Sequence, residues 1–288
     1  MLKRKTKKLE IIKKRSFDEE RALYNLTDAE VCECRFEGPL DGESALKECR
    51  NITVRSSSFT LRYPLWHADG FRLIDSSMDM HARAPIWYST RGSLEKSKIF
   101  SIKALRECSS VEIKDSEINS PEFGWKCSDI TVSNSYAQGE YLFLDSKNIL
   151  IDRMTMRGKY SFQYIDGLTI DNSSLDTKDA FWHSKNVTVR NSVVKGEYLG
   201  WFSENLTLIN CEIIGTQPLC YCKNLTLIGC RMKECDLSFE YSDVNADIIG
   251  HIDSVKNPKS GRIIADSVGE IIYDQSVIDA LGKVEIRK

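Results

Sequence analysis

The chain has 288 residues, 41% of them hydrophobic, and a formal net charge of −2, so it can bury a sizeable core in one large domain or two ordinary ones. This near-balance of charge produces no global field that favours a polyanion, and no nucleic-acid partner is expected. No apolar run reaches the ~18 residues of a membrane span, and no secretory leader is recognised. The ten cysteines are therefore expected to be reduced thiols in a cytoplasmic protein.

Residues 1–27 are expected to form a basic arm and a cap. Eight Lys or Arg and one Glu lie within residues 1–15, which is typical of a solvated arm or a first strand, with a short surface for nucleic acid or membrane as the alternative. Residues 17–26, FDEERALYNL, have the charge and apolar spacing of a helix. They predict a helical cap on the first coil, with a strand as the alternative.

Residues 28–256 repeat one pattern every nineteen residues. The units CSSVEIKDS, CSDITVSNS, SKNILIDRM, IDGLTIDNS, SKNVTVRNS, SENLTLINC and CKNLTLIGC start at residues 108, 127, 146, 165, 184, 203 and 222. Each unit leads into three short stretches of alternating apolar and polar residues, which indicate strands with one buried face. The period predicts an all-β fold: a single-stranded, right-handed parallel β-helix of about eleven coils.

Equivalent positions of successive units are expected to stack about 4.8 Å apart. All five tryptophans stand two residues before a unit start, and we expect them to line the interior: Trp66, Trp87, Trp125, Trp182 and Trp201. Small residues share a second column that is also expected inside: Ser57, Ser76, Ser97, Ser116, Ser135, Ser173, Ser192, Cys211 and Cys230. Alternating large and small columns would fill a narrow interior evenly.

The same columns give structural interpretations to two tempting motifs. Cys220, Cys222 and Cys235 resemble a zinc-site cluster, but we interpret them as small buried packing residues. The Asn-x-Ser/Thr tripeptides at Asn186 and Asn205, with those at positions 51 and 224, are interpreted as turns that enter the next strand rather than as glycosylation sites.

The blocks GESALKECRNITV (42–54), YPLWHADG (63–70), KDAFWHS (178–184) and GEYLGWFS (196–203) resemble an uncharacterised bacterial family, domain of unknown function 3737. The resemblance spans roughly residues 20–275, and the repeats are similar to the right-handed β-helices of the pectin-lyase-like superfamily. The resemblance implies a β-helix with no assigned activity, and it carries over no catalytic residue. Many members of the wider superfamily cleave or bind polysaccharides, but a shared fold is a poor warrant for a shared function.

If the tryptophans face inward, their neighbours on the third stretch face outward, and these neighbours are rich in aromatic and acidic residues. The predicted ligand-binding strip consists of Tyr141, Tyr160, Phe181, Tyr198, Gln217 and Tyr221. A large aromatic surface on a soluble monomer indicates a binding partner. We expect an oligosaccharide, whose apolar faces stack on flat rings, or self-association of the chain. A covering loop and an ordinary surface are the alternatives.

Four residues on the same face are candidates for acid–base catalysis: Asp179, His183, Asp236 and Glu240. Asp179 and Asp236 share a column three coils apart, about 14 Å, which exceeds the ~5–9.5 Å separation of a glycosidase pair. Asp179 and His183 lie four residues apart along one stretch, which argues against direct contact. No cofactor and no metal are predicted, because the carboxylates do not cluster as calcium ligands do.

Two functions from different classes therefore stay open. The first is a binding or assembly scaffold that uses the aromatic and acidic strip. The second is a cytoplasmic carbohydrate-active enzyme of the polysaccharide lyase or glycoside hydrolase type. Residues 257–288, where the period fades, are expected to form closing coils and a cap, with a short helix near residues 277–281.

Overall fold

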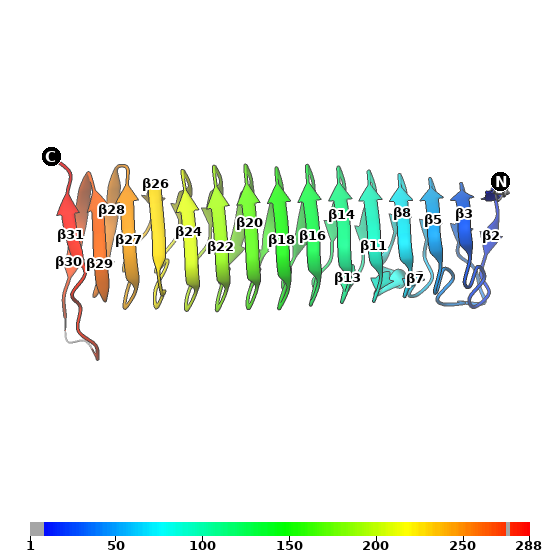
Figure 1. The fold of residues 1–288 in the computed structure, drawn as a ribbon, viewed down its shortest axis with the longest axis horizontal. Helices are drawn as coiled ribbons and strands as arrows, with labels where there is room; N and C mark the ends of the chain where they lie inside the picture. Colours follow the sequence, from blue (N-terminus) through cyan, green and yellow to red (C-terminus); the bar gives the residue numbers. More distant parts are fainter. Residues whose placement is uncertain (1–8, 275–276) are drawn as a thin grey trace, which may run out of the picture.

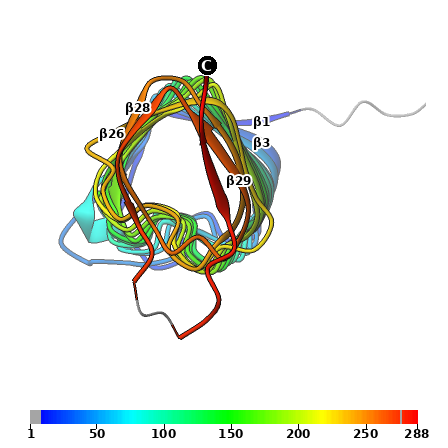
Figure 2. The same ribbon diagram turned by 90° about the vertical axis from the view of Figure 1, so that its left-hand side faces the viewer.

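The structure, a computed structural model, describes residues 9–274 and 277–288. The chain winds into a parallel β-helix of about 14 turns, a long rod with the two chain ends at opposite ends (Figure 1). Viewed along the rod, the coils superpose on one outline (Figure 2). Neighbouring strands of each sheet pair in parallel. The all-β parallel β-helix predicted from the repeat is confirmed, with more turns than the eleven expected.

Most strands belong to two rows that run the length of the rod. The long sheet contains β1 (Glu10–Lys13), β3 (Thr27–Cys32), β5 (Arg50–Arg55), β8 (Asp69–Ile74), β11 (Thr90–Glu95), β14 (Ser109–Lys114), β16 (Ser128–Ser133), β18 (Lys147–Asp152), β20 (Asp166–Asp171), β22 (Lys185–Arg190), β24 (Glu204–Ile209), β26 (Leu225–Lys233), β27 (Asp243–Ile248), β29 (Ser260–Ala265) and β31 (Lys283–Ile286). The second sheet contains β2 (Ser16–Phe17), β4 (Arg35–Phe36), β6 (Ser58–Phe59), β9 (Ser77–Met78), β12 (Lys98–Phe100), β15 (Glu117–Asn119), β17 (Tyr136–Gly139), β19 (Thr155–Lys159), β21 (Ser174–Lys178), β23 (Val193–Lys195), β25 (Glu212–Ile214) and the end of β26.

The remaining elements are short. A third sheet contains β7 (Leu65–Trp66), β10 (Ile86–Trp87) and β13 (Leu105–Arg106), and a fourth pairs β28 (His251–Lys256) with β30 (Ser267–Ile272). One 3₁₀ helix, η1, spans Met80–Ala82. We call the side of the rod between a second-sheet strand and the next long-sheet strand the third face.

Register in the middle of the rod follows the nineteen-residue period. Val111 pairs with Ile130, which in turn pairs with Ile149. Coils toward the ends have other lengths: Thr27 pairs with Arg50, and Asp243 pairs with Ser260. These irregular coils carry no clear repeat in the sequence, which is why the predicted number of coils was too low.

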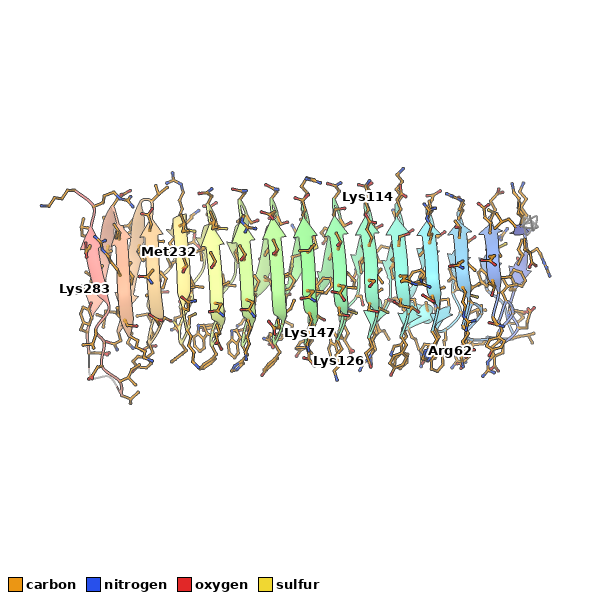
Figure 3. The ribbon with its side chains drawn as sticks, in the orientation of Figure 1. Arg62, Lys114, Lys126, Lys147, Met232 and Lys283 are labelled. Atoms are coloured by element: carbon orange, nitrogen blue, oxygen red, sulfur yellow. The ribbon has the colours of Figure 1, made fainter. Side chains whose placement is uncertain are left out.

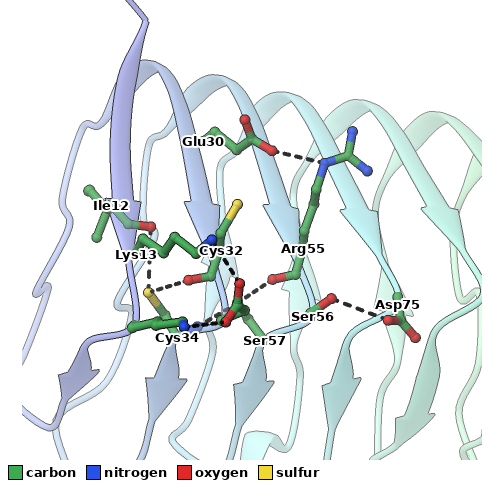
Figure 4. A network of polar contacts seen from close by, with 11 residues as sticks. Ile12, Lys13, Glu30, Cys32, Cys34, Arg55, Ser56, Ser57 and Asp75 are labelled. Atoms are coloured by element: carbon green, nitrogen blue, oxygen red, sulfur yellow. Dashed lines mark hydrogen bonds and ion pairs between the residues drawn. The ribbon is translucent and has the colours of Figure 1, made fainter.

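The interior contains apolar columns and a column of small polar residues. Val189 and Ile113 are fully buried on the long sheet, and every member of the predicted serine and cysteine column is at most 7% exposed. Serine hydroxyls in this column accept hydrogen bonds from the backbone of the preceding coil, for example Ser57 N to Ser76 Oγ at 3.1 Å. Figure 4 shows the hydrogen bond of this kind nearest the N-terminus, in which Cys34 N donates to Ser57 Oγ at 3.0 Å. The column therefore satisfies turn amides as well as filling space.

Cysteine residues behave as the columns predict, whereas the asparagine residues lie inside strands. All ten cysteines are free, and nine are buried, with Cys32 half-buried. Asn186 and Asn205 have φ near 55°, and their exposed amides form a ladder in which Asn205 Nδ2 donates to Asn186 Oδ1 at 2.9 Å. Asparagine tolerates this left-handed backbone better than most residues. The structure places Asn186 and Asn205 at the second position of β22 and β24, as left-handed kinks within the strands rather than as turns before them.

The two predicted helices are wrong. Residues 19–25 form a turn, in which the amides of Arg21, Leu23 and Asn25 donate to carbonyls of the next coil at 2.8–2.9 Å. These bonds run along the rod rather than four residues back along the chain, so no helix forms. Residues 277–281 form bends and irregular backbone. The basic arm is described only from residue 9, where β1 supplies a first strand; residues 1–8 lie outside the described part of the chain.

Candidate functional site

The tryptophans lie on the outside of the third face, and the prediction that they line the interior is wrong. All five tryptophans are half-buried, whereas the residue before each of them is buried. Leu65, Ile86 and Phe181, for example, are at most 2% exposed. The cause is a corner in the backbone one residue after each tryptophan. His67, Tyr88 and Lys126 have φ between 51° and 54° at this corner. A left-handed residue turns the chain, so two successive side chains face outward and simple alternation fails.

The corner residues of the C-terminal coils form a continuous row of neighbouring rings, four stacked and the fifth tilted, which we call the outer ladder: Tyr164, His183, Phe202, Tyr221 and Tyr241. The first four rings have centroid separations of 4.8–5.1 Å and interplanar angles of 8–12°. Tyr164 is 55% exposed and Phe202 44% exposed. Figure 3 shows side chains projecting along this edge of the rod, where Lys126 occupies the same column nearer the N-terminus.

Trp182 and Trp201 form a second, half-buried stack beside the outer ladder. Their centroids are 5.4 Å apart with an interplanar angle of 3°, and both rings meet Phe202 edge-on. Each indole N–H donates to a backbone carbonyl sixteen residues further along the chain, Tyr198 O and Gln217 O, at 2.7 Å. These bonds fix the orientation of the indoles, which hold the ladder in a straight row.

Stacking determines what the outer ladder can present to a partner. Ring faces within the row cover one another, so the exposed surface is a line of ring edges, one per coil. Aromatic edges carry partial positive charge, and each stacked pair adds about 0.5–1.5 kcal/mol to the stability of the coils. Flat faces for sugar stacking, on which the predicted strip depended, are therefore largely occupied along this row. The ring edges are interspersed with the hydroxyls of Tyr164 and Tyr221 and the imidazole of His183.

The predicted strip is split by the structure. Tyr141 and Tyr160 stack at 5.0 Å, Tyr198 meets Trp201 edge-on at 5.3 Å, and Tyr221 belongs to the outer ladder. Gln217 is half-buried, and its backbone carbonyl accepts the hydrogen bond from the Trp201 indole.

Phe181 does not belong to an exposed strip, because it is 2% exposed and stacks on Phe162 inside the rod at 5.3 Å. Tyr164 and Phe202 were absent from the predicted strip. Their common phase, one residue before a unit start, was the available signal.

The four catalytic candidates are not brought together. Asp179 is 7% exposed, and burial raises the pKa of its carboxyl. His183 is stacked between Tyr164 and Phe202 in the outer ladder. Asp236 accepts a hydrogen bond from the Thr216 hydroxyl. The fourth candidate, Glu240, forms an ion pair with a lysine of β28 at 3.1 Å. Each candidate already has a structural partner or a buried position.

Neighbouring charges are also paired. Lys178 and Glu197 form an ion pair at 3.0 Å, and this contact raises the pKa of the lysine. Lys159 and Glu140, which directly precede the stacked Tyr160 and Tyr141 in the chain, form an ion pair at 3.2 Å. Within residues 9–274 and 277–288, no three His, Cys, Asp or Glu side chains gather as metal ligands would. No helix in the same residues is long and apolar enough to cross a membrane.

Comparison with known proteins identifies a family. A family model described as a protein of unknown function, DUF3737, matches residues 10–287, and the chain belongs to this family. No curated protein sequence matches the chain.

Solved structures share its architecture at low sequence identity. PfbA, a surface adhesin of Streptococcus pneumoniae, superposes with a TM-score of 0.54 and 7% identity, covering 80% of this chain and 84% of the adhesin. The catalytic domain of a GH87 alpha-1,3-glucanase in complex with nigerose gives a TM-score of 0.43 and 10% identity, covering 84% of this chain and 64% of its own. An endo-xylogalacturonan hydrolase from Aspergillus tubingensis gives a TM-score of 0.35 and 8% identity, covering 83% and 87%. The likeness to the adhesin shows a shared fold alone.

Proposed function

We propose that the protein is a non-catalytic scaffold whose outer ladder binds an elongated glycan lying along the rod. The observation that supports this most strongly is the row of rings, one per coil, from Tyr164 to Tyr241. The first three rings are exposed, and the last two are half-buried. A periodic row offers the same edge at each step, so a ligand made of repeating units gains a similar contact at every coil. A compact ligand would use only one or two rings.

The chemistry of the row suits an amphipathic polymer. The ring edge of Phe202 is apolar, whereas the Tyr164 and Tyr221 hydroxyls and the His183 imidazole can exchange hydrogen bonds. A glycan chain likewise alternates C–H surface with hydroxyls. Because the ring faces are covered by their neighbours, binding rests on edge contacts and hydrogen bonds, with flat stacking available only at the ends of the row. Many weak contacts in series then provide the affinity.

The arrangement of acidic groups favours binding over catalysis. A glycosidase requires two carboxyl groups about 5–9.5 Å apart across the scissile bond, and a calcium-dependent site requires several oxygen ligands on one ion. Asp179 is buried, while Asp236 and Glu240 are held by Thr216 and Lys256. The similarly folded pneumococcal protein is described as a surface adhesin, so binding without chemistry is compatible with the fold.

Affinity electrophoresis of the full chain against immobilised glycans tests the proposal. Phe202→Ala and Tyr164→Ala should reduce retardation in the glycan gel that retains the wild type. Ile228→Ala is a matched control, because Ile228 is an apolar side chain of similar exposure (48%) on the long sheet. Retention by no glycan, equal loss in the control, or release of sugar products from any glycan would contradict the proposal. A change of oligomeric state without a change in retention would point instead to self-association.

A further inference from the structure

A second part of the third face, in the N-terminal coils, contains a hollow of about 390 Å³. Its lining consists of Tyr63, Arg83, Ala84, Trp87, Ile102, Lys103 and Glu122. Here Asp69 pairs with Thr90, a coil two residues longer than the regular repeat, and the additional chain includes η1. Arg83, which follows η1 with φ 53°, directs the chain back toward β10. The longer coil leaves space that the regular coils do not have.

Two indole groups in this part of the third face have no hydrogen-bond acceptor within residues 9–274 and 277–288. The indole N–H groups of Trp66 and Trp87 are buried and have no hydrogen-bond partner among the described residues. The equivalent N–H groups of Trp125, Trp182 and Trp201 all donate to backbone carbonyls at 2.6–2.7 Å. A buried donor without a partner costs about 1–3 kcal/mol, and such groups often mark functional positions. Trp87, which lines the hollow, is therefore not fixed by an indole hydrogen bond as Trp125, Trp182 and Trp201 are.

The charged side chains around the hollow are also unbalanced toward positive charge. Glu122 is shared by two cations, Lys103 at 3.5 Å and Arg106 at 3.4 Å. Arg83 lines the same hollow and forms no ion pair with any described residue. Arginine presents a planar fork of donors that matches a carboxylate in a bidentate geometry. The hollow is therefore rich in donors and has one carboxylate of its own, already engaged.

Its walls provide apolar surface beside these donors. Trp87 stacks on Trp66 at 5.7 Å, and Tyr63 packs against the edges of both indoles at 6.1–6.2 Å. Ala84 and Ile102 complete the apolar part of the lining. We propose that this hollow binds a six-membered ring that carries a carboxylate, with the carboxylate on Arg83 and Lys103 and the ring against Ile102 and the edge of Trp87, whose faces are covered by Trp66 and Arg106. Two classes of ligand have this chemistry, acidic sugars and aromatic acids.

This site lies on coils other than those of the outer ladder and is independent of the proposed glycan scaffold. Four probes define the ligand: galacturonate and its neutral counterpart galactose, and benzoate and its neutral counterpart benzyl alcohol. Binding is followed in the ¹⁵N-labelled full chain by the five indole N–H resonances, assigned by Trp→Phe variants. We expect one or both acids to shift the Trp87 resonance while those of Trp182 and Trp201 stay in place.

Variants separate the carboxylate contact from general effects. Arg83→Gln should weaken binding of the acid about tenfold or more, since a charge-assisted pair is lost. Arg231→Gln, an exposed arginine of β26 without an ion pair among the described residues, should leave binding unchanged. Tighter binding of galacturonate assigns the site to an acidic sugar, and tighter binding of benzoate assigns it to an aromatic acid. Equal shifts by the neutral probes, no shift by any probe, or an unchanged Arg83→Gln variant would overturn the proposal.

Discussion

The serine column makes a direct prediction about the stability of the rod. Ser116 is 5% exposed, and its Oγ accepts a hydrogen bond from Ser97 N at 3.1 Å and donates to Lys114 O at 2.8 Å. Ser116→Ala removes both bonds and leaves a buried amide of the preceding coil without its acceptor. An unpaired buried amide costs about 1–3 kcal/mol. We therefore expect Ser116→Ala to lower the free energy of unfolding by that amount, and Tm by several degrees.

Ser101→Ala is the matched control. Ser101 is fully buried, as Ser116 nearly is, but its Oγ has no partner among the described residues. Deleting this hydroxyl should leave stability unchanged or raise it, because the alanine has no unpaired polar group to bury. Urea unfolding followed by far-UV circular dichroism measures both variants against the wild type. Equal destabilisation of the two variants would refute the reasoning, because the effect would then come from lost volume rather than from the ladder.

Three further predictions follow from burial and pairing. Val189→Asp should abolish the folded β signal in circular dichroism, because an unpaired charge at a fully buried position costs several kcal/mol. Asp179→Asn should stabilise the protein at pH 7: burial raises the pKa of this carboxyl, so the native state loses stability as pH rises above the unfolded value of about 3.9, and the gain should vanish in melts at lower pH. Trp182→Phe should lower Tm more than Trp87→Phe, since only Trp182 has an acceptor for its indole N–H.

Much of the architecture could be predicted, because in a stacked repeat the length of the sequence period gives the register between neighbouring coils. The nineteen-residue period identified which residues lie above one another, and Trp182 on Trp201 confirms this stacking. The direction in which a column faces could not be obtained in the same way. Period-two alternation predicts direction only within a strand, and the corner residues, such as His183 with φ 53°, reverse it. The tryptophans were therefore placed inside and Phe181 outside, both the wrong way round.

The ends of the rod were poorly predicted for a different reason. Helix-like spacing at residues 17–26 depends on apolar residues three and four apart, and a tight turn that buries part of Leu23 and Leu26 against the core produces the same spacing. Hydrogen bonds to the neighbouring coil, such as Leu23 N to Ala45 O at 2.8 Å, then decide against a helix. Local pattern carries no information about such bonds, because their partners lie on a coil of irregular length.

The two halves of the third face differ in one backbone feature, and that difference connects conformation to function. In the C-terminal coils a further left-handed residue precedes the corner, such as Phe162 or Phe181 with φ of 60–63°, and the chain there offers a carbonyl to each indole. In the N-terminal coils the same positions form β7 and β10, and the indoles of Trp66 and Trp87 find no acceptor. Satisfied indoles support a rigid row suited to a long polymer, whereas the longer coil, with its hollow and an Arg83 that has no ion pair among the described residues, suits a small acid. One repeat thus yields two kinds of binding surface.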